Sequence, residues 1–330
     1  MKLVSSIFSV RHAMVIGATL IGAGAAAPAQ AELLAGTWTV KAPMAAGKHG
    51  EVAAVAYQDK LYAVGGAVDG NSVPHNEVYD PATNSWKILA PMPTARDHVA
   101  LALVNGKIYT FGGFTKSVHM NAGTDVFEYD PATNNWRTRA PMKVALGSVG
   151  AAVIDGKIHV LGGRSIDNTK TLPTHMVYDP ATDTWKDAAP MTKGRDHMAT
   201  VVAEGKIHVI GGRFTSPVDR TDMHDVYDPA TDSWSSAPPL KTPRSAVAAA
   251  LYHGMIVVDG GEYPPENKTW TENEAYDLKS KSWFTLAPMP QTGSHGFGAA
   301  VIGPNLYFVG GSTLPGGSGL TDRLLMFTLQ

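Results

Sequence analysis

The sequence predicts an all-β fold: a single six-bladed β-propeller whose blades are four-stranded antiparallel sheets. Two repeated features carry this prediction. Gly-Gly pairs recur at intervals of 47 to 50 residues, at positions 65–66, 112–113, 162–163, 211–212, 260–261 and 310–311. A Trp follows each of the first five pairs and opens a short segment that ends in Ala-Pro-Met or a close variant. Six sheets with this period can bury their faces by packing around one axis.

The N-terminal residues 1–31 are expected to be a cleaved signal peptide. Lys2 and Arg11 give a positive start, residues 13–27 are apolar, and residues 29–31 (Ala-Gln-Ala) fit the small-x-small pattern of a cleavage site. The apolar run is shorter than the roughly 20 residues that cross a bilayer, which argues against a membrane anchor. We therefore expect residues 32–330 to form one domain without a membrane span, in a periplasmic or secreted protein.

The local pattern of one unit predicts its strands in order. Residues 99–103 alternate as a strand does, and Asn105-Gly106 is a hairpin signal. Residues 107–111 form a second strand that ends at the Gly-Gly pair, where a positive φ costs least. After a polar loop, a third strand ends at Tyr129. The turn Asp-Pro-Ala-Thr-Asn then leads to a fourth strand that begins at Trp136.

The two ends of the chain are predicted to close the ring. The last unit stops where its third strand should finish and lacks the Trp strand. The matching segment, Trp-Thr-Val-Lys-Ala-Pro-Met at residues 38–44, stands near the N-terminus with no unit before it. Pairing these ends completes the sixth blade and removes two free sheet edges.

Composition excludes several classes of protein. The chain has 27 basic and 29 acidic residues, a formal charge of −2, and no long run of one sign, which argues against a nucleic-acid partner or an anionic membrane. It has no cysteine, which excludes disulfides, Cys-ligated zinc, iron–sulfur clusters and a thiol nucleophile.

These motifs resemble the kelch repeat over about residues 35–330. The resemblance rests on the double Gly, the Tyr-Asp turn, the Trp seven residues after that Tyr, and the period of the repeat. The sequence departs from the pattern at Leu278, where the turn has Pro in other units, and at Pro239-Leu240, which replaces Pro-Met. The resemblance implies a six-bladed propeller, but propellers serve both binding and catalysis.

The direction of the chain predicts which face of the propeller carries the functional site. If the first strand of each blade is innermost, one face carries only short, nearly identical turns. The other face carries the loops after Met and after Gly-Gly. The second set of loops varies from 12 to 15 residues between Gly-Gly and Tyr. Variation on one face of a regular scaffold is where we place the functional site.

The loop that enters the innermost strand supplies the first candidate residues, which are Arg96, Arg195, Arg244, His98, His197 and His295. In the two Arg-Asp-His segments, strand alternation would place Arg and His on one face, toward the central channel. The resemblance implies that arginines at this position line a ligand pocket. The alternative is that each Arg packs in the fold and pairs with Asp97, Asp196 or a buried carbonyl.

The loops after Gly-Gly supply further candidates, Arg164, Arg213 and Glu262. Four histidines, His75, His119, His175 and His224, are also placed near this mouth. No two of them lie at a tight ligand spacing with a carboxylate, so we expect no metal and no other cofactor. Trp270 is the one Trp outside the repeat, and we expect it to be exposed and to contact a ligand.

Two functions fit these predictions. The first is a monomeric binding module that holds a protein, a peptide or a glycan on the variable loop face. Its ligand-binding candidates are Arg96, Arg195, Arg244, Arg164, Arg213, His295 and Trp270.

The second function is a sugar mutarotase or epimerase of the periplasm. Kelch relatives include galactose oxidase and a periplasmic mutarotase of N-acetylneuraminate. The oxidase needs a Tyr–Cys cross-link, which a chain without cysteine cannot form. By resemblance to the mutarotase, His98, His197 or Glu262 would act as general acid or base. Arg96, Arg195 or Arg244 would then hold the carboxylate of an acidic sugar.

Overall fold

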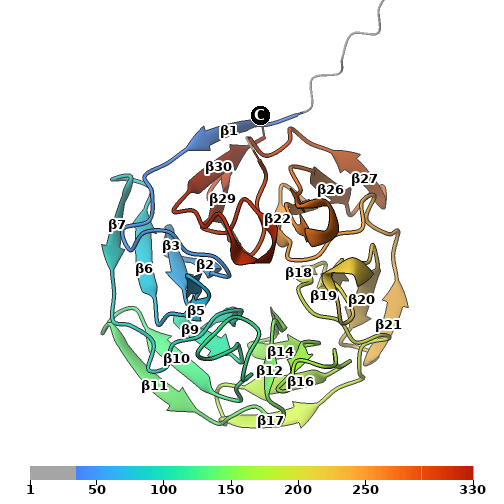
Figure 1. Ribbon diagram of the computed structural model, residues 1–330. Helices are drawn as coiled ribbons and strands as arrows, with labels where there is room; N and C mark the ends of the chain where they lie inside the picture. The colour runs from blue at the N-terminus through green and yellow to red at the C-terminus, as the bar shows by residue number, and fades with distance from the viewer. Residues whose placement is uncertain (1–34, 291, 330) are drawn as a thin grey trace, which may run out of the picture. The chain divides into compact units, whose positions relative to one another are not determined.

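The computed structural model describes residues 35–290 and 292–329, so the predicted signal peptide lies outside the described residues. The described residues form a closed ring of six four-stranded antiparallel sheets around a central channel (Figure 1). The prediction of a six-bladed propeller is therefore confirmed. Within the described residues, no helix is long and apolar enough to cross a membrane.

The blades are numbered I to VI along the chain, and their strands run from the channel outward. Blade I comprises β2 (Ala53–Tyr57), β3 (Lys60–Val64), β6 (Asn76–Asp80) and β7 (Ser85–Ile88). Blade II comprises β8 (Ala100–Val104), β9 (Lys107–Phe111), β10 (Val126–Asp130) and β11 (Asn135–Arg139). Blade III comprises β13 (Gly150–Ile154), β14 (Lys157–Leu161), β16 (His175–Asp179) and β17 (Thr184–Asp187).

The second half of the ring repeats this order. Blade IV comprises β18 (Ala199–Ala203), β19 (Lys206–Ile210), β20 (His224–Asp228) and β21 (Ser233–Ser236). Blade V comprises β22 (Ala248–Tyr252), β23 (Met255–Asp259), β26 (Asn273–Asp277) and β27 (Ser282–Thr285). Blade VI comprises β28 (Gly298–Ile302), β29 (Asn305–Val309), β30 (Leu324–Thr328) and β1 (Thr37–Val40).

The loops between the second and third strands carry most of the remaining elements. Two-stranded ribbons form from β4 (Ala67–Val68) with β5 (Asn71–Ser72), β12 (Leu146–Gly147) with β15 (Arg164–Ser165), and β24 (Glu262–Tyr263) with β25 (Lys268–Thr269). Three 3₁₀ turns begin at Pro: η1 (Pro217–Asp219), η2 (Pro264–Glu266) and η3 (Pro315–Gly317).

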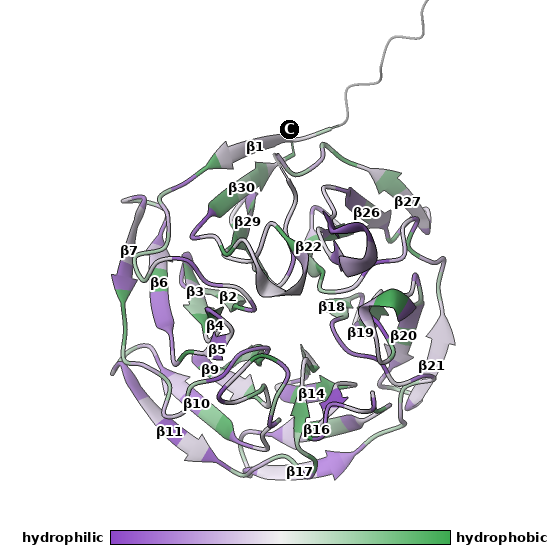
Figure 2. Ribbon diagram, viewed as in Figure 1, coloured by the Kyte–Doolittle hydropathy of each residue, from purple (hydrophilic) through white to green (hydrophobic). Residues whose placement is uncertain are grey.

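The core lies between neighbouring blades. The second strand of each blade is almost wholly buried, as in β3, whereas outer strands such as β11 and β17 are largely exposed. Hydropathy agrees with this difference in exposure, since β11 and β17 are mostly hydrophilic (Figure 2). In blades I to V the repeated Trp packs against the Tyr of its own blade, with ring centroids 5.2 Å apart for Tyr79 and Trp86, and in blade VI Trp38 packs against Phe327. Such aromatic pairs fill the space between sheets.

One hydrogen bond recurs at every blade boundary. The indole N–H of each Trp donates to the carbonyl that precedes the Pro-Met segment of the blade before it. The six bonds join Trp86 to Ala42, Trp136 to Ala90, Trp185 to Ala140, Trp234 to Ala189, Trp283 to Pro238 and Trp38 to Ala287. The repeated Trp therefore joins blades by a directed bond as well as by packing.

The Tyr-Asp turn serves the same boundary. In blade I, the hydroxyl of Tyr79 donates to Oδ1 of Asn84 at 2.7 Å. The backbone N–H of Ala42 donates to the same oxygen at 3.0 Å. Asn84 has φ of 49°, a left-handed conformation that Asn tolerates. In blades I to IV the Asn or Asp at the end of the motif therefore serves both backbone geometry and hydrogen bonding, whereas blade V has Lys281 there, with φ of 53°.

The predicted closure is confirmed. Strand β1 pairs antiparallel with β30, with Thr37 opposite Thr328 and Val40 opposite Leu325. Trp38 packs against Phe327, with ring centroids 4.9 Å apart. The N-terminal strand therefore completes blade VI as its outer strand and closes the ring.

Candidate functional site

The two sets of variable loops lie on one face, as predicted, and are joined there by short β-bridges. In every blade, the loop after Gly-Gly pairs with a residue just before the innermost strand. The pairs are Gly50 with Ala67, Asp97 with Phe114, Gly147 with Arg164, Asp196 with Arg213, Ser245 with Glu262 and His295 with Ser312. We call this side of the ring the loop face.

The glycine pairs allow this close approach. Gly65 has φ of 69°, and a Cβ there would lie 2.8 Å from the carbonyl oxygen of Arg96 in the next blade. The Gly-Gly motif therefore lets each loop pass close to the segment that leads into the innermost strand of the next blade, which we call the entry segment.

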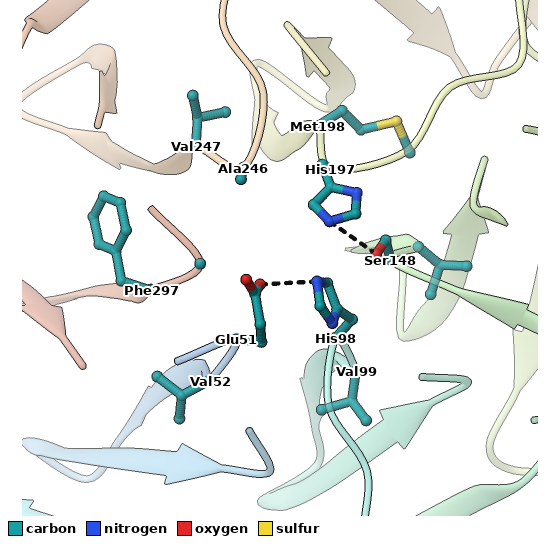
Figure 3. Close-up of a pocket in the computed structure, with 12 residues that line it drawn as sticks. Glu51, Val52, His98, Val99, Ser148, His197, Met198, Ala246, Val247 and Phe297 are labelled. Carbon is teal, nitrogen blue, oxygen red and sulfur yellow. Dashed lines mark hydrogen bonds and ion pairs between the residues drawn. The ribbon is translucent and has the colours of Figure 1, made fainter. Parts of the chain in front are cut away.

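Six residues, one just before the innermost strand of each blade, line the channel. We call them the channel ring. All six have φ between 53° and 59°, and they are Glu51, His98, Ser148, His197, Ala246 and Gly296. Backbone N–H groups link several of them around the ring, for example Ser148 to the carbonyl of His98 at 3.1 Å and Ala246 to that of His197 at 2.9 Å. Together with the residue that follows each, they enclose a cavity of ≈ 110 Å³ (Figure 3).

The left-handed conformation turns His98 and His197 toward the channel. In Figure 3 both imidazoles point into the space between the blades, opposite Glu51. Nε2 of His98 lies 2.9 Å from Oε2 of Glu51, and its Nδ1 lies 2.5 Å from Oδ1 of Asp97. Burial lowers the pKa of His98, but Glu51 and Asp97 outweigh burial and raise this pKa to about 10. Burial would raise the pKa of Glu51, yet His98 lowers it well below its usual range.

His197 is held in a corresponding way in blade IV. Its Nδ1 contacts Oδ1 of Asp196, and Ser148 lies 3.5 Å from its Nε2. Because Asp196 accepts the Nδ1 proton, Nε2 carries the free lone pair, which accepts from Nη2 of Arg213 at 2.9 Å. Burial and then the charge of Arg213 hold the pKa of His197 well below its usual value.

His119 reaches the same place from the loop between β9 and β10. Its Nε2 lies 3.1 Å from Nε2 of His197, and its ring centroid lies 4.6 Å from that of His98. Burial and then the charge of His98 lower the pKa of His119 to about 2. Of the four loop histidines placed near the mouth from sequence, His119 joins the channel histidines.

Charged groups of blades III to VI surround these histidines. Nη1 of Arg213 lies 2.7 Å from Oε1 of Glu262, and its Nε lies 3.1 Å from Oδ1 of Asp196. Arg164 lies 3.5 Å from Asp196, and His295 lies 3.7 Å from Glu262. We call the whole set the channel cluster. Its members are Glu51, Asp97, His98, His119, Arg164, Asp196, His197, Arg213, Glu262 and His295.

The prediction that Arg and His of the Arg-Asp-His segments share a face is wrong. His98 and His197 have left-handed φ, which breaks strand alternation, so the arginines turn into the blades instead. Arg195 and Arg244 are fully buried. The Nη atoms of each contact carbonyls or carboxylates within its blade, such as Asp225, which lies 2.6 Å from Nη1 of Arg195. Arg96 contacts Asp125 and the carbonyl of Gly113.

Loop length explains why sequence reasoning missed Glu51 and misplaced His295. The segments before β2 and β28 each have one more residue after Met than the segment before β8. Lys48 follows Met44 at the offset that Arg96 has from Met92, but the structural equivalent of Arg96 is His49, and that of His98 is Glu51. His295 occupies the bridge position of Asp97, one residue before the channel ring.

The remaining candidate positions differ from expectation. Trp270 is buried, with 9% of its surface exposed, and Nζ of Lys268 lies 3.5 Å from its ring centroid. Its predicted exposure is therefore wrong. His175 and His224 lie inside blades III and IV, where each contacts the His of the second strand, His159 or His208, at 2.8 Å. His75 packs against His49, with ring centroids 3.9 Å apart.

We expected no metal because no two loop histidines lie at a tight ligand spacing in the sequence. This reason fails, because the fold brings together histidines that are far apart in the sequence. His98, His119 and His197 each offer a nitrogen, and these atoms lie within 4.8 Å of one another. No spacing in the sequence reveals this, since the three residues come from two entry segments and one loop.

The ring, its repeated blade contacts and its one variable face define a β-propeller of the kelch class. The family model KLHDC2/KLHL20/DRC7 Kelch-repeats domain matches residues 50–261, and the chain belongs to the kelch-repeat family. The resemblance seen in the sequence is thereby confirmed.

Curated relatives match over short stretches. Kelch-like protein terF of Aspergillus terreus is 40% identical over 102 residues, which cover 28% of this chain and 22% of that protein. The F-box/kelch-repeat protein At4g19870 of Arabidopsis thaliana is 32% identical over 75 residues, covering 23% and 19%. Kelch-like ECH-associated protein 1A of Danio rerio is 38% identical over 65 residues, covering 18% and 11%. The matches therefore span about a fifth or less of these relatives.

A solved structure entitled "Structure of YjhT" has the same fold. It superimposes with a TM-score of 0.72 at 20% identity, covering 84% of this chain and 94% of that one. At this identity the likeness concerns the architecture alone.

Proposed function

We propose that this chain is an exported binding module whose loop face holds a protein or peptide partner. One observation carries the proposal. Loops of four different blades each present an exposed apolar side chain, namely Met120, Ile166, Val218 and Leu314, with 62%, 55%, 55% and 42% of their surface exposed. Apolar side chains that gather around one mouth form the kind of surface that a protein partner buries.

A groove on the same face suits an extended segment of a partner. It has a volume of ≈ 840 Å³ and lies between the loops of blades I and VI. Its walls include Lys48, Asp69 and Leu320, together with the glycine-rich stretch 316–319. Glycines expose backbone N–H and C=O groups, which can pair with the backbone of a bound peptide.

The alternative is a sugar mutarotase or epimerase. His98, His197 and Glu262 belong to one cluster, which would suit acid–base chemistry. The channel cavity of ≈ 110 Å³ is smaller than the roughly 300–1,000 Å³ of small-molecule pockets. Arg195 and Arg244, expected to clamp a sugar carboxylate, are buried inside their blades. Cavity size therefore favours the binding module, with a glycan on the loop face as the other outcome to test.

The experiment compares two triple variants in native cells. Met120→Ser, Ile166→Ser and Val218→Ser remove apolar tips from the loop face. Val40→Ser, Ile88→Ser and Phe284→Ser remove exposed apolar side chains from the outer strands β1, β7 and β27 and serve as the matched control. Cross-linked partners are quantified by mass spectrometry.

We expect the wild type and the outer-strand variant to capture the same protein, and the loop variant to lose most of it. Equal capture by both variants would overturn the proposal. Faster anomer exchange of a sugar in NMR, without a protein partner, would favour the alternative. The mass of the purified chain tests export separately, with a mature N-terminus expected at Glu32.

A further inference from the structure

Three imidazole nitrogens converge at the inner end of the loop face. The Nε2 atoms of His119 and His197 are 3.1 Å apart, and the ligand atoms of His98, His119 and His197 all lie within 4.8 Å of one another. Tetrahedral coordination with bonds of about 2.0–2.1 Å places nitrogen ligands about 3.4 Å apart. Small side-chain rotations would therefore bring all three nitrogens onto one ion.

Two of these histidines are oriented by carboxylates. Asp97 contacts Nδ1 of His98, and Asp196 contacts Nδ1 of His197. This arrangement directs both Nε2 atoms toward the channel. Histidines that bind metal ions commonly donate their other ring N–H to a carboxylate in the same way. It arises twice from the same Arg-Asp-His segment, at equivalent positions of blades II and IV.

The charge of the channel cluster also favours a cation. The cluster contains four carboxylates, on Glu51, Asp97, Asp196 and Glu262, and two guanidinium groups, on Arg164 and Arg213. With its imidazoles neutral, as metal ligands must be, its formal charge is −2, which one divalent ion would neutralise, and the proton that His98 carries in the metal-free protein leaves on binding. Glu51 lies beside Nε2 of His98 at 2.9 Å and can supply a fourth donor atom.

We propose that the channel cluster binds one divalent transition-metal ion of the Zn²⁺ and Cu²⁺ class through Nε2 of His98, His119 and His197, with Glu51 as the fourth ligand. Imidazole nitrogens select this class, whereas Ca²⁺ and Mg²⁺ prefer oxygen ligands. The ion would tie the loop of blade II that carries His119 to the channel ring. This inference is independent of the partner proposed for the loop face.

Arg213 competes with the ion. Its Nη2 lies 2.9 Å from Nε2 of His197 and 3.4 Å from Nε2 of His119, so it donates to the lone pairs that the ion needs. Its other nitrogens are held by Asp196 and Glu262. Metal binding therefore requires Nη2 to withdraw, and removing the guanidinium should tighten binding.

The test is a calorimetric titration of the chelator-treated full chain with ZnCl₂, followed by Co²⁺ absorption spectroscopy. We expect one Zn²⁺ per chain and the d–d bands of tetrahedral Co²⁺. His119→Ala and His197→Ala should each weaken Zn²⁺ binding at least about 10-fold, and Asp196→Asn about 10- to 100-fold. Arg213→Met should strengthen it. His253→Ala removes an exposed His outside the cluster and should change nothing.

Folding is checked by circular dichroism, and His119→Ala is the variant least prone to misfold because His119 lies on a loop and is only half-buried. The proposal is overturned if the wild type shows no saturable one-to-one binding of Zn²⁺ or Cu²⁺. It is equally overturned if folded His119→Ala binds Zn²⁺ as the wild type does.

Discussion

The indole N–H of Trp38 donates a 2.9 Å hydrogen bond to the carbonyl of Ala287, a residue 249 positions further along the chain. The same bond recurs at the other five blade boundaries. Here, however, it joins the N-terminal strand to blade V, so ring closure and blade packing depend on one side chain.

Replacing Trp38 tests this closure. Trp38→Phe removes the hydrogen bond but keeps an aromatic ring, and we expect it to lower the free energy of unfolding by about 1 kcal/mol. Trp38→Ala also removes packing against Phe327 and Phe308 and should lower it by about 2–3 kcal/mol. Urea unfolding measures both values. Unchanged stability in Trp38→Ala would show that the terminal strand does not hold the ring.

The fold could be predicted because each repeated residue has one local task. The Gly-Gly pair permits close approach, the Asn or Asp of the turn accepts two hydrogen bonds, and the Trp bonds the preceding blade. These tasks recur at nearly constant spacing, so the period shows blade number and closure without any tertiary information.

Replacing Arg195 tests whether the arginines of the entry segments have a structural role. Its Nη1 lies 2.6 Å from Oδ2 of Asp225, and its Nη2 donates to the carbonyl of Val209 at 3.0 Å. Arg195→Met would leave Asp225 buried without a counter-ion, and we expect a loss of about 3–5 kcal/mol in the free energy of unfolding.

The double variant Arg195→Met with Asp225→Asn is the matched control, because it removes both charges. We expect it to recover a large part of the lost stability in the same urea titration. A folded Arg195→Met variant with wild-type stability that fails to bind a ligand would instead support the ligand-binding role implied by the resemblance.

The site was less predictable than the fold, for two physical reasons. Alternation fails at His98 and His197 because their backbone is left-handed, a property that residue type does not reveal. His119 comes from a loop whose path depends on tertiary contacts, so its approach to His197 has no sequence signal. Glu51, by contrast, could have been found by aligning each segment on its strand, since one extra residue precedes β2.

The carboxyl group of Glu77 should make stability depend on pH. Burial raises its pKa from 4.5 to about 7, and hydrogen bonds from the N–H groups of Ala45 and Ala46 oppose this shift. Between these two pH values the unfolded chain is ionised while the folded chain keeps its proton. Stability from this group is therefore present at low pH and is lost as pH rises through 7, by about 3 kcal/mol at its limit.

Glu77→Gln removes this titration and should flatten the pH profile of the free energy of unfolding between pH 5 and pH 8. Glu266→Gln changes an exposed carboxylate on a loop and should leave the profile as in the wild type. If Glu77→Gln and wild type showed the same slope, Glu77 would not be the group responsible.

The buried histidine pair of blade IV should act in the opposite direction. Nδ1 of His208 lies 2.8 Å from Nε2 of His224, and burial lowers the pKa of each to about 4. The unfolded chain takes up protons near pH 6.5 while the folded pair stays neutral. Stability is therefore present above pH 6.5 and falls toward pH 4, by about 2 kcal/mol for each histidine at pH 5.

Blade I supplies the matched replacement for this pair. There, Tyr62 and Asn76 occupy the equivalent positions, and Nδ2 of Asn76 donates to the carbonyl of Ala90 as Nδ1 of His224 does to that of Pro238. The double variant His208→Tyr with His224→Asn should match the wild type at pH 8 and exceed its stability at pH 5. Urea unfolding at both pH values decides the matter, because a parallel loss of stability in both proteins at pH 5 would place the acid sensitivity elsewhere in the propeller.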